Sequence, residues 1–290
     1  MNDRHFPWDD VVDCHIHVVG PSHRFPQASG RHYTAAEASV EDLRNVVPAE
    51  VSRFVVVQPS FYGTDNRVTL AAVAALQGKG RAVIVLDPRT ATAAQLEDLH
   101  AQGVRGLRIN LNSALKDDVR EVSDELALHA RVAQAVGWHI ELVLPLDALI
   151  RASDLIAALP VQVVIDHYGL PIGHSPESDA GRSLLRLFDM PHVWTKLSAP
   201  YRVGGNPLAT VPPAEWIAAI VARAFDRCLW GSDWPHTPAK TEQRSRDEAA
   251  PYRRIAYRDL LDGFCAAMPL DALLRATRTN PEKLYEFSSN

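Results

Sequence analysis

Short runs of β-branched and apolar residues alternate along the chain with stretches that have helical periodicity. Because such runs favour strands and apolar positions three or four residues apart favour helices, the alternation predicts parallel strands joined by helical crossovers. Most of the runs are apolar throughout, as in a parallel sheet covered by helices. We predict strands near Val11–Ile16, Phe54–Val57, Ala82–Leu86, Gly106–Ile109, His139–Leu144, Val161–Ile165, Val193–Leu197 and Cys228–Trp230.

Helical segments fill most of the intervals. Thr92 is placed to cap a helix with Gln95, and Gly103 and Gly137 follow two helices just before the next strand. The predicted helices are Val68–Gln77, Ala93–Gln102, Asp124–Val136, Ala148–Leu159, Ser183–Phe188, Ala214–Phe225 and Leu270–Thr277. Eight strand–helix alternations in roughly 250 residues favour an α/β fold of the (β/α)8 TIM-barrel type over an open doubly wound sheet. We expect one such domain over residues 1–290.

Composition narrows the class of protein. The chain has 290 residues, 47% of them hydrophobic and 22% charged, and a net charge of -5, without the basic stripe of a nucleic-acid-binding protein. The longest apolar runs are strand-sized, so we predict no membrane span and no signal peptide. The three cysteines, Cys14, Cys228 and Cys265, lack Cys-x-x-Cys spacing. This pattern predicts a cytoplasmic protein without a disulfide scaffold.

Polar side chains follow most of the predicted strands. In (β/α)8 barrels the chemistry lies at the carboxyl ends of the strands, and polar groups there are costly to bury without a purpose. The candidates read from these ends are His15 and His17, Ser60, Arg108, His167, Lys196 and Arg202, and Asp233 and His236.

The His15-Ile16-His17 pair and Asp233 are the strongest of these candidates. Residues two apart on a strand project to the same face, so both imidazoles point the same way. Asp233 lies in Trp230-Gly231-Ser232-Asp233-Trp234, directly after the last strand. We expect two imidazoles and one carboxylate to meet around one cavity, where they polarise a carbonyl and activate water.

Other interpretations of these residues stay open. Asp233 alone would also suit a helix cap. His167 alone would suit a structural role, although it follows a strand end. Arg108 is a candidate anion binder, whereas Lys196 and Arg202 are equally compatible with an ion pair and with a ligand contact.

These motifs together resemble the amidohydrolase superfamily and, within it, the 2-pyrone-4,6-dicarboxylate lactonase group. His-x-His after the first strand, a histidine in Ile165-Asp166-His167 and Trp-Gly-Ser-Asp-Trp-Pro-His after the last strand carry the resemblance. It continues, over nearly the whole chain, through Val19-Gly20-Pro21, Arg24-Phe25-Pro26, Arg31-His32-Tyr33-Thr34, Gly63-Thr64-Asp65-Asn66, Gly103-Val104-Arg105-Gly106 and Thr279-Asn280-Pro281.

The resemblance implies a distorted barrel that hydrolyses lactones without a required metal. It implies that Asp233 is the general base and that His15, His17 and His167 face the lactone carbonyl. It places the substrate-binding contacts at Ser60, Tyr33, Arg108 and Arg202, with Lys196 and His236 as further candidates. The implied partner is a small lactone with an anionic group, and a homo-oligomer is left open.

Two positions depart from that pattern. The group has an arginine where this chain has Ala114, and a strand-five tyrosine where it has Val143. Since an arginine–carboxylate fork is directional and alanine cannot replace it, the departure favours a lactone with one anionic group, or a sugar-acid lactone. Lys116 lies nearby in the sequence.

The chemistry leaves a metal as an alternative. An exposed aspartate has a pKa of about 3.9, and we expect burial to raise the pKa of Asp233 while neighbouring imidazolium opposes the rise. His15, His17, His167 and Asp233 are also a suitable set of ligands for one Zn²⁺. We therefore predict a metal-independent lactonase, with a lactone isomerase, a zinc-dependent decarboxylase or hydrolase, and a sugar-acid-binding barrel without catalysis as alternatives.

Overall fold

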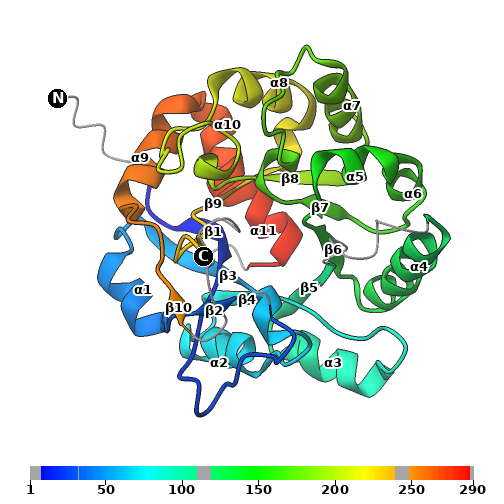
Figure 1. The fold of residues 1–290 in the computed structure, drawn as a ribbon, viewed down its shortest axis with the longest axis vertical. Coiled ribbons are helices and arrows are strands. Elements are labelled where there is room, and N and C mark those ends of the chain that lie inside the picture. The colour runs from blue at the N-terminus through cyan, green and yellow to red at the C-terminus, as the bar shows by residue number, and fades with distance from the viewer. Residues whose placement is uncertain (1–7, 32, 110–118, 239–247, 288–290) are drawn as a thin grey trace.

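Eight parallel strands form a nearly closed barrel in the computed structural model, which describes residues 8–31, 33–109, 119–238 and 248–287. In order around the barrel, the strands are β1 (Val11–Ile16), β3 (Val51–Val57), β4 (Gly80–Ile84), β5 (Val104–Ile109), β6 (His139–Leu142), β7 (Val163–Ile165), β8 (Val193–Ser198) and β9 (Cys228–Gly231). This confirms the predicted fold class (Figure 1).

Two backbone hydrogen bonds join the segment that follows the last strand to the end of the first strand. The N–H of Asp233 donates to the carbonyl of His15 at 2.9 Å, and the N–H of His17 donates to the carbonyl of Trp234 at 2.8 Å. The same segments that carry the predicted catalytic residues therefore close the barrel.

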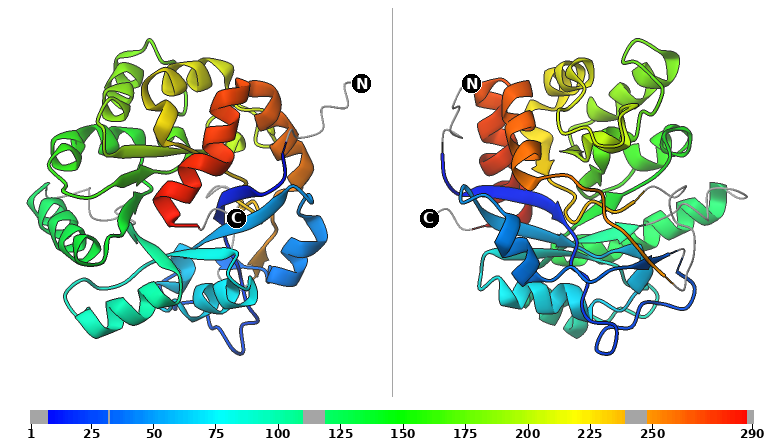
Figure 2. Two further views of the ribbon diagram at one scale, coloured as in Figure 1. Left: turned by 180° about the vertical axis from the view of Figure 1, so that it is seen from behind. Right: turned by 60° about the vertical axis from the view of Figure 1, so that its left-hand side comes forward.

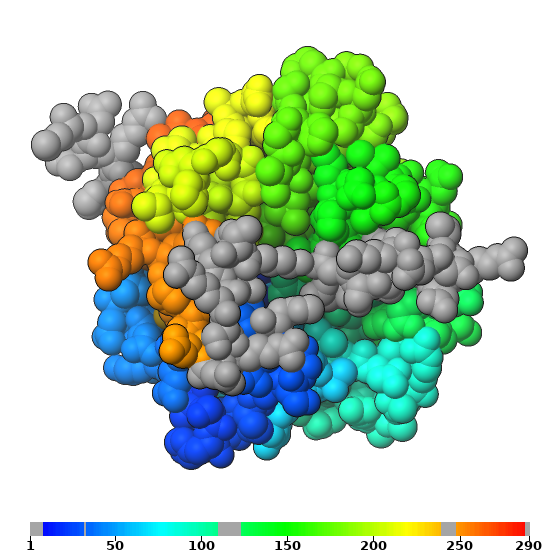
Figure 3. All heavy atoms as spheres, viewed as in Figure 1, coloured from blue at the N-terminus to red at the C-terminus, as the bar shows by residue number. Residues whose placement is uncertain are grey.

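Helices surround the barrel (Figures 1 and 2). They are α1 (Val40–Val46), α2 (Arg67–Ala75), α3 (Ala93–Ala101), α4 (Val119–Val136), α5 (Leu146–Arg151), α6 (Ser153–Ala157), α7 (Asp179–Phe188), α8 (Ala214–Ala224), α9 (Tyr257–Ala267), α10 (Leu270–Leu274) and α11 (Asn280–Tyr285). The space-filling view shows the helices α5 to α8 packed side by side along one edge of the face seen in Figure 1 (Figure 3). None of the helices in the described parts of the chain is both long and apolar enough to cross a membrane.

Local signals explain several helix boundaries. The Thr92 side chain accepts a hydrogen bond from the N–H of Gln95 at the start of α3. Gly103 (φ +97°) and Gly137 (φ +73°) follow α3 and α4 in the left-handed region, where glycine carries no steric penalty.

Several elements differ from the sequence prediction. The single helix predicted over Ala148–Leu159 is wrong, because the chain forms α5 and α6 with a break at Ala152. The helix predicted to begin at Ser183 begins at Asp179 instead, since the Ser178 side chain caps it. Helices α1, α9 and α11 were not predicted, and neither was the parallel pair of β2 (Thr34–Ala35) and β10 (Ala249–Ala250).

Candidate active site

His15 and His17 enter the site from an irregular end of β1. Asp13 pairs with Phe54 and Ile16 with Val56, so β1 carries one more residue than β3 over this stretch. Such a bulge re-aims the side chains next to it. The Nε2 atoms of His15 and His17 lie 3.2 Å apart, and both rings are buried.

Gly231 on β9 makes room for this arrangement. A Cβ at position 231 would lie 2.7 Å from the Cβ of His15, closer than real Cβ contacts allow. The glycine in Trp-Gly-Ser-Asp therefore lets the first strand pack closely against the last one.

Asp233 lies opposite the two histidines, with a left-handed backbone (φ +58°) that is uncommon for a residue with a side chain. Its Oδ2 accepts hydrogen bonds from the hydroxyl of Tyr201 at 2.7 Å and from Nε of Arg202 at 2.9 Å. Its Oδ1 lies 3.5 Å from Nε2 of both His15 and His17 and has no hydrogen-bond partner among the described residues. One oxygen of this carboxylate is thus held in place while the other faces the histidines.

Both expected influences act on the ionisation of Asp233. Burial raises the pKa of its carboxyl, but Arg202 and the surrounding histidines outweigh burial and hold the pKa well below the usual range. The largest lowering influence, the guanidinium of Arg202, was left open in the sequence between an ion pair and a ligand contact, and the structure shows its ion pair with Asp233. Asp233 is therefore a carboxylate at neutral pH.

His167 completes the group of imidazoles. It follows β7 with φ +52°, its ring centroid lies 4.9 Å from that of His15, and its Nδ1 is 2.8 Å from the Oγ of Ser198. Burial lowers the pKa of His167 to about 4. Burial and the Lys196 ammonium together lower the pKa of His15 well below its ordinary value. Both rings are neutral at pH 7, so each has one N–H donor and one acceptor nitrogen.

A chain of hydrogen bonds fixes the protons of the paired histidines. Nζ of Lys196 lies 3.1 Å from Nδ1 of His15, and Nδ1 of His17 lies 2.7 Å from the carbonyl oxygen of Val57. An ammonium only donates and a carbonyl only accepts. His15 therefore accepts at Nδ1 and carries its proton on Nε2, whereas His17 carries its proton on Nδ1.

Lys196 lies behind His15 rather than on the cavity wall. Its side chain is fully buried, and its ammonium contacts Glu141 and lies 3.6 Å from Oδ1 of Asp166. Of the two alternatives for this residue, the structure shows the ion pair. Burial and the nearby Asp166 carboxylate raise the pKa of Glu141.

The other predicted ligand contacts differ in their exposure and in their hydrogen bonds within the protein. Arg108 donates from Nη1 to the carbonyl of Gln58 at 3.1 Å, and its Nη2 lies 3.3 Å from Asp166. Tyr33 is half-buried beside Phe61, and burial raises its pKa to about 12. Ser60 is exposed at the start of the 3-10 turn Ser60–Tyr62.

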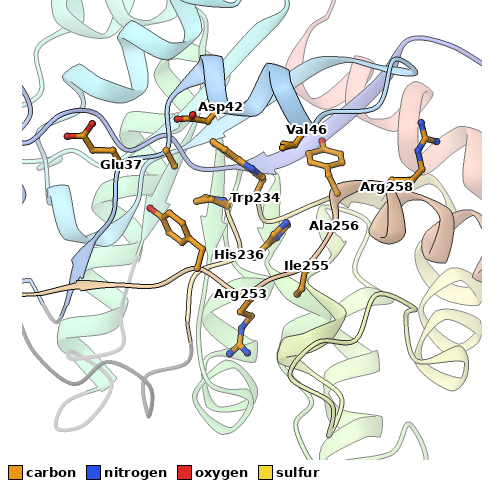
Figure 4. A pocket seen from close by; sticks show the side chains of 13 residues that line it. Glu37, Asp42, Val46, Trp234, His236, Arg253, Ile255, Ala256 and Arg258 are labelled. Atoms are coloured by element: carbon orange, nitrogen blue, oxygen red, sulfur yellow. The ribbon is translucent and has the colours of Figure 1, made fainter.

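His236 links the site to a groove outside it. Its Nδ1 is 3.5 Å from the hydroxyl of Tyr201, the donor to Asp233, and its Nε2 has no hydrogen-bond partner among the described residues. Burial lowers the pKa of His236 to about 4. The groove has a volume of about 520 Å³ and lies between α1 and the segment that leads into α9 (Figure 4). Asp42, Trp234 and Arg253 also line it.

Three of the four predicted zinc ligands form one group, without His167, and their hydrogen-bond pattern does not suit a metal. Among the described residues, the ligand atoms of His15, His17 and Asp233 all lie within 4.8 Å of one another, and so do those of His15, Asp166 and His167. Both groups include His15, whose Nε2 carries a proton and whose Nδ1 is held by an ammonium. A metal needs an unprotonated ring nitrogen, so these residues as arranged do not fit zinc.

Sequence reasoning missed several residues of the site. Tyr201 was not assigned, although it directly precedes Arg202 after a strand end. Glu141 was not assigned either, although a carboxylate inside the apolar segment His139–Leu142 is costly to bury and was a usable signal. Asp13 accepts hydrogen bonds from the N–H groups of His15 at 3.0 Å and Ser232 at 2.9 Å, and so ties β1 to the Asp233 segment.

The fold and the strand-end residues define a barrel enzyme of the amidohydrolase type, with His-x-His after the first strand and aspartate after the last. The chain belongs to the amidohydrolase family, whose model matches residues 12–287.

Three characterised relatives are similar to this chain in sequence. The chain is 33% identical to a 2-pyrone-4,6-dicarboxylate hydrolase of Comamonas testosteroni, over 79% of this chain and 78% of the relative. It is also 33% identical to a 4-sulfomuconolactone hydrolase of Rhizobium radiobacter, over 81% and 79%. A D-galactarolactone isomerase of Agrobacterium fabrum is 26% identical, over 96% and 91%.

Solved structures share the fold of this chain. A probable 2-pyrone-4,6-dicarboxylic acid hydrolase of Acinetobacter baumannii with bound citric acid is 25% identical, with a TM-score of 0.77 over 96% of this chain and 100% of that one. An amidohydrolase of Burkholderia multivorans with bound zinc has a TM-score of 0.68 and 20% identity over 96% and 100%. A member of this fold class can therefore hold zinc.

Proposed function

We propose that this protein is a lactonase that opens the ring of a small anionic lactone with water activated by Asp233 and without a metal. The observation that carries the proposal is the geometry of Asp233. Its Oδ1 is buried, lacks a hydrogen-bond partner among the described residues and lies 3.5 Å from two imidazole nitrogens at the mouth of the barrel. The hydrolase names of the relatives from Comamonas testosteroni and Rhizobium radiobacter support the same reaction class.

The residues suit the steps of ester hydrolysis. Oδ1 of Asp233 takes a proton from a water whose oxygen attacks the lactone carbonyl carbon. Negative charge then develops on the carbonyl oxygen, where neutral His15 and His167 offer N–H donors. Cleavage of the ring C–O bond releases an alkoxide that recovers the proton from Asp233. The products are a carboxylic acid and an alcohol, and the carboxyl group ionises at neutral pH.

We further propose that the substrate has one anionic group. Arg108 and Arg202 each have five N–H donors and use some of them within the protein, at Gln58 and Asp166 and at Asp233 and Thr237. The remaining donors are enough for one carboxylate or sulfonate. Ala114 lies outside the described residues, as does Lys116, and an alanine at position 114 supplies no guanidinium for a second anionic group.

Lactone isomerisation is the second candidate, since the isomerase of Agrobacterium fabrum covers more of this chain than the hydrolases do. A hydroxyl of the substrate would then replace water as the nucleophile, with Asp233 in the same role. This needs a substrate with a free hydroxyl near its carbonyl, as in sugar-acid lactones.

One experiment separates these reactions. The purified protein is mixed with a panel of sulfonated, carboxylated and sugar-acid lactones in weak buffer with a pH indicator, in isotopically labelled water. Hydrolysis releases one proton per turnover and places one labelled oxygen in the product carboxyl group. Isomerisation does neither, and turnover without label would replace the lactonase by the isomerase.

The cellular setting is also part of the proposal. Three scattered cysteines without paired spacing suit the cytoplasm. A small anionic lactone suits a role in catabolism, and a homo-oligomer stays a prediction.

A further inference from the structure

A buried cluster of charges lies directly beneath the histidine pair. Lys196 of β8 is fully buried together with Glu141 of β6 and with Asp166 at the end of β7. Burying three ionisable groups is costly unless they are paired and hydrogen-bonded. The ammonium lies against Glu141, 3.6 Å from Oδ1 of Asp166 and 3.1 Å from Nδ1 of His15.

The two histidines of the pair are set up differently. His17 donates from Nδ1 to the carbonyl of Val57 at 2.7 Å, which leaves its Nε2 unprotonated. That is the form in which a histidine binds a metal, with its other nitrogen donating to a carbonyl or carboxylate. His15 has carboxylates at the matching place, since its Nδ1 lies 3.5 Å from Asp166 and 3.9 Å from Glu141. Lys196 lies closer to that nitrogen, at 3.1 Å, and can only donate to it.

We propose that Lys196 is a positioning residue that holds His15 with its proton on Nε2 and thereby keeps divalent metals out of the site. With the proton on Nε2, His15 donates to the unprotonated Nε2 of His17, 3.2 Å away, and this is the N–H that the metal-free mechanism of the proposed function directs to the substrate. Without Lys196, Asp166 accepts the proton of Nδ1, and the Nε2 atoms of His15 and His17 both become ligands beside Asp233. The inference rests on the proposed function for its catalytic meaning, but metal exclusion itself is measured without any substrate.

The test compares zinc binding by the wild type and two variants. Lys196→Met removes the ammonium and nearly keeps the volume of the side chain. Adding Glu141→Gln to Lys196→Met also removes the carboxylate that the single substitution leaves without its lysine. This double variant is the test protein if Lys196→Met alone does not fold. Lys283→Met is the control for the loss of a lysine, because Lys283 is exposed on α11 and its ammonium lies over the ring of Trp194.

Zinc affinity is measured by competition with a coloured chelator. Metal content is measured after gel filtration. Second-layer contacts of this kind change metal affinity by about 10- to 100-fold, so we expect a gain of this size in the Lys196 variants and none in the control. Adding His15→Gln to the double variant removes the gain. NMR of histidine labelled with the heavy nitrogen isotope shows the proton of His15 on Nε2 in the wild type and on Nδ1 in the double variant.

Equal zinc affinity in the wild type and in both folded variants overturns the inference, as does a wild-type His15 protonated on Nδ1. The proposed function fails separately. If no lactone is turned over while zinc affinity rises as expected, Lys196 still excludes the metal, but the reaction class is wrong.

Discussion

Replacing Asp233 by asparagine tests the base at the atom that acts. Tyr201 and Arg202 both donate to Oδ2 of Asp233, so an amide at this position has to place its carbonyl oxygen there. The NH2 group then occupies the place of Oδ1, 3.5 Å from the Nε2 atoms of His15 and His17. Asp233→Asn therefore keeps the local hydrogen bonds and puts a donor where a proton acceptor is needed.

The expected loss follows from the role of the lost group. A positioned general base contributes about 100- to 10,000-fold to a rate, which corresponds to about 3 to 5 kcal/mol of transition-state stabilisation. We expect kcat/KM of Asp233→Asn to fall within this range, with far-ultraviolet circular dichroism unchanged. Initial rates are read as proton release from the lactone that the wild type turns over fastest.

A matched substitution controls for the loss of a carboxylate in general. Asp226→Asn removes a surface carboxylate that forms an ion pair with Arg275. Its rate should equal that of the wild type. If Asp233→Asn keeps kcat/KM within threefold of the wild type, Asp233 is not the base, and the mechanism proposed above is wrong.

Two further predictions concern the arginines. Arg202 holds the pKa of the Asp233 carboxyl well below its usual range, so the carboxylate persists in acid. We expect kcat/KM to fall only at pH values below the ordinary pKa range of aspartate. Arg202→Gln should shift the acid limb of the pH–rate profile to higher pH. An unshifted limb would contradict this assignment. Arg108→Met should raise KM for an anionic lactone by about 10- to 100-fold, the value of a hydrogen bond to a charged group. Arg105→Met on the same strand, where Arg105 forms an ion pair with Glu286 at 2.7 Å, should leave KM unchanged; equal effects of the two substitutions would make Arg108 a structural residue.

The strands were predictable because each combines β-branched composition with a short, bounded apolar run. All eight lie where the sequence places them, to within a few residues at the ends. The unpredicted helix α1 had a signal in Ser39-Val40-Glu41-Asp42, whose side chains form a capping box in the structure. The β2–β10 pair joins segments more than two hundred residues apart and has two residues in each strand, so no local pattern marks it.

The depth of a residue inside the barrel was harder to predict than its direction. Lys196 and Ser198 of β8 are two residues apart, so they share a face but differ by about 6.6 Å along the strand. The sequence prediction ended this strand at Leu197 and placed Lys196 at the rim. The strand continues to Ser198, which contacts His167, and Lys196 lies one layer lower beside Glu141.

The low pKa of Asp233 limits which substrates the site can turn over. A carboxylate held strongly in its ionised form is a weak base, so it removes a proton from water effectively only when the attacked carbonyl is already reactive. An amide needs a stronger nucleophile and protonation of a poor leaving group. The neighbouring His15 and His167, whose pKa values are both lowered, are poor sources of that proton at pH 7. Ring opening of an activated ester tolerates both a weak base and poor proton donors, because its leaving oxygen needs little protonation. The same ion pair with Arg202 that keeps Asp233 ready to accept a proton in acid therefore also favours lactones over amides as substrates.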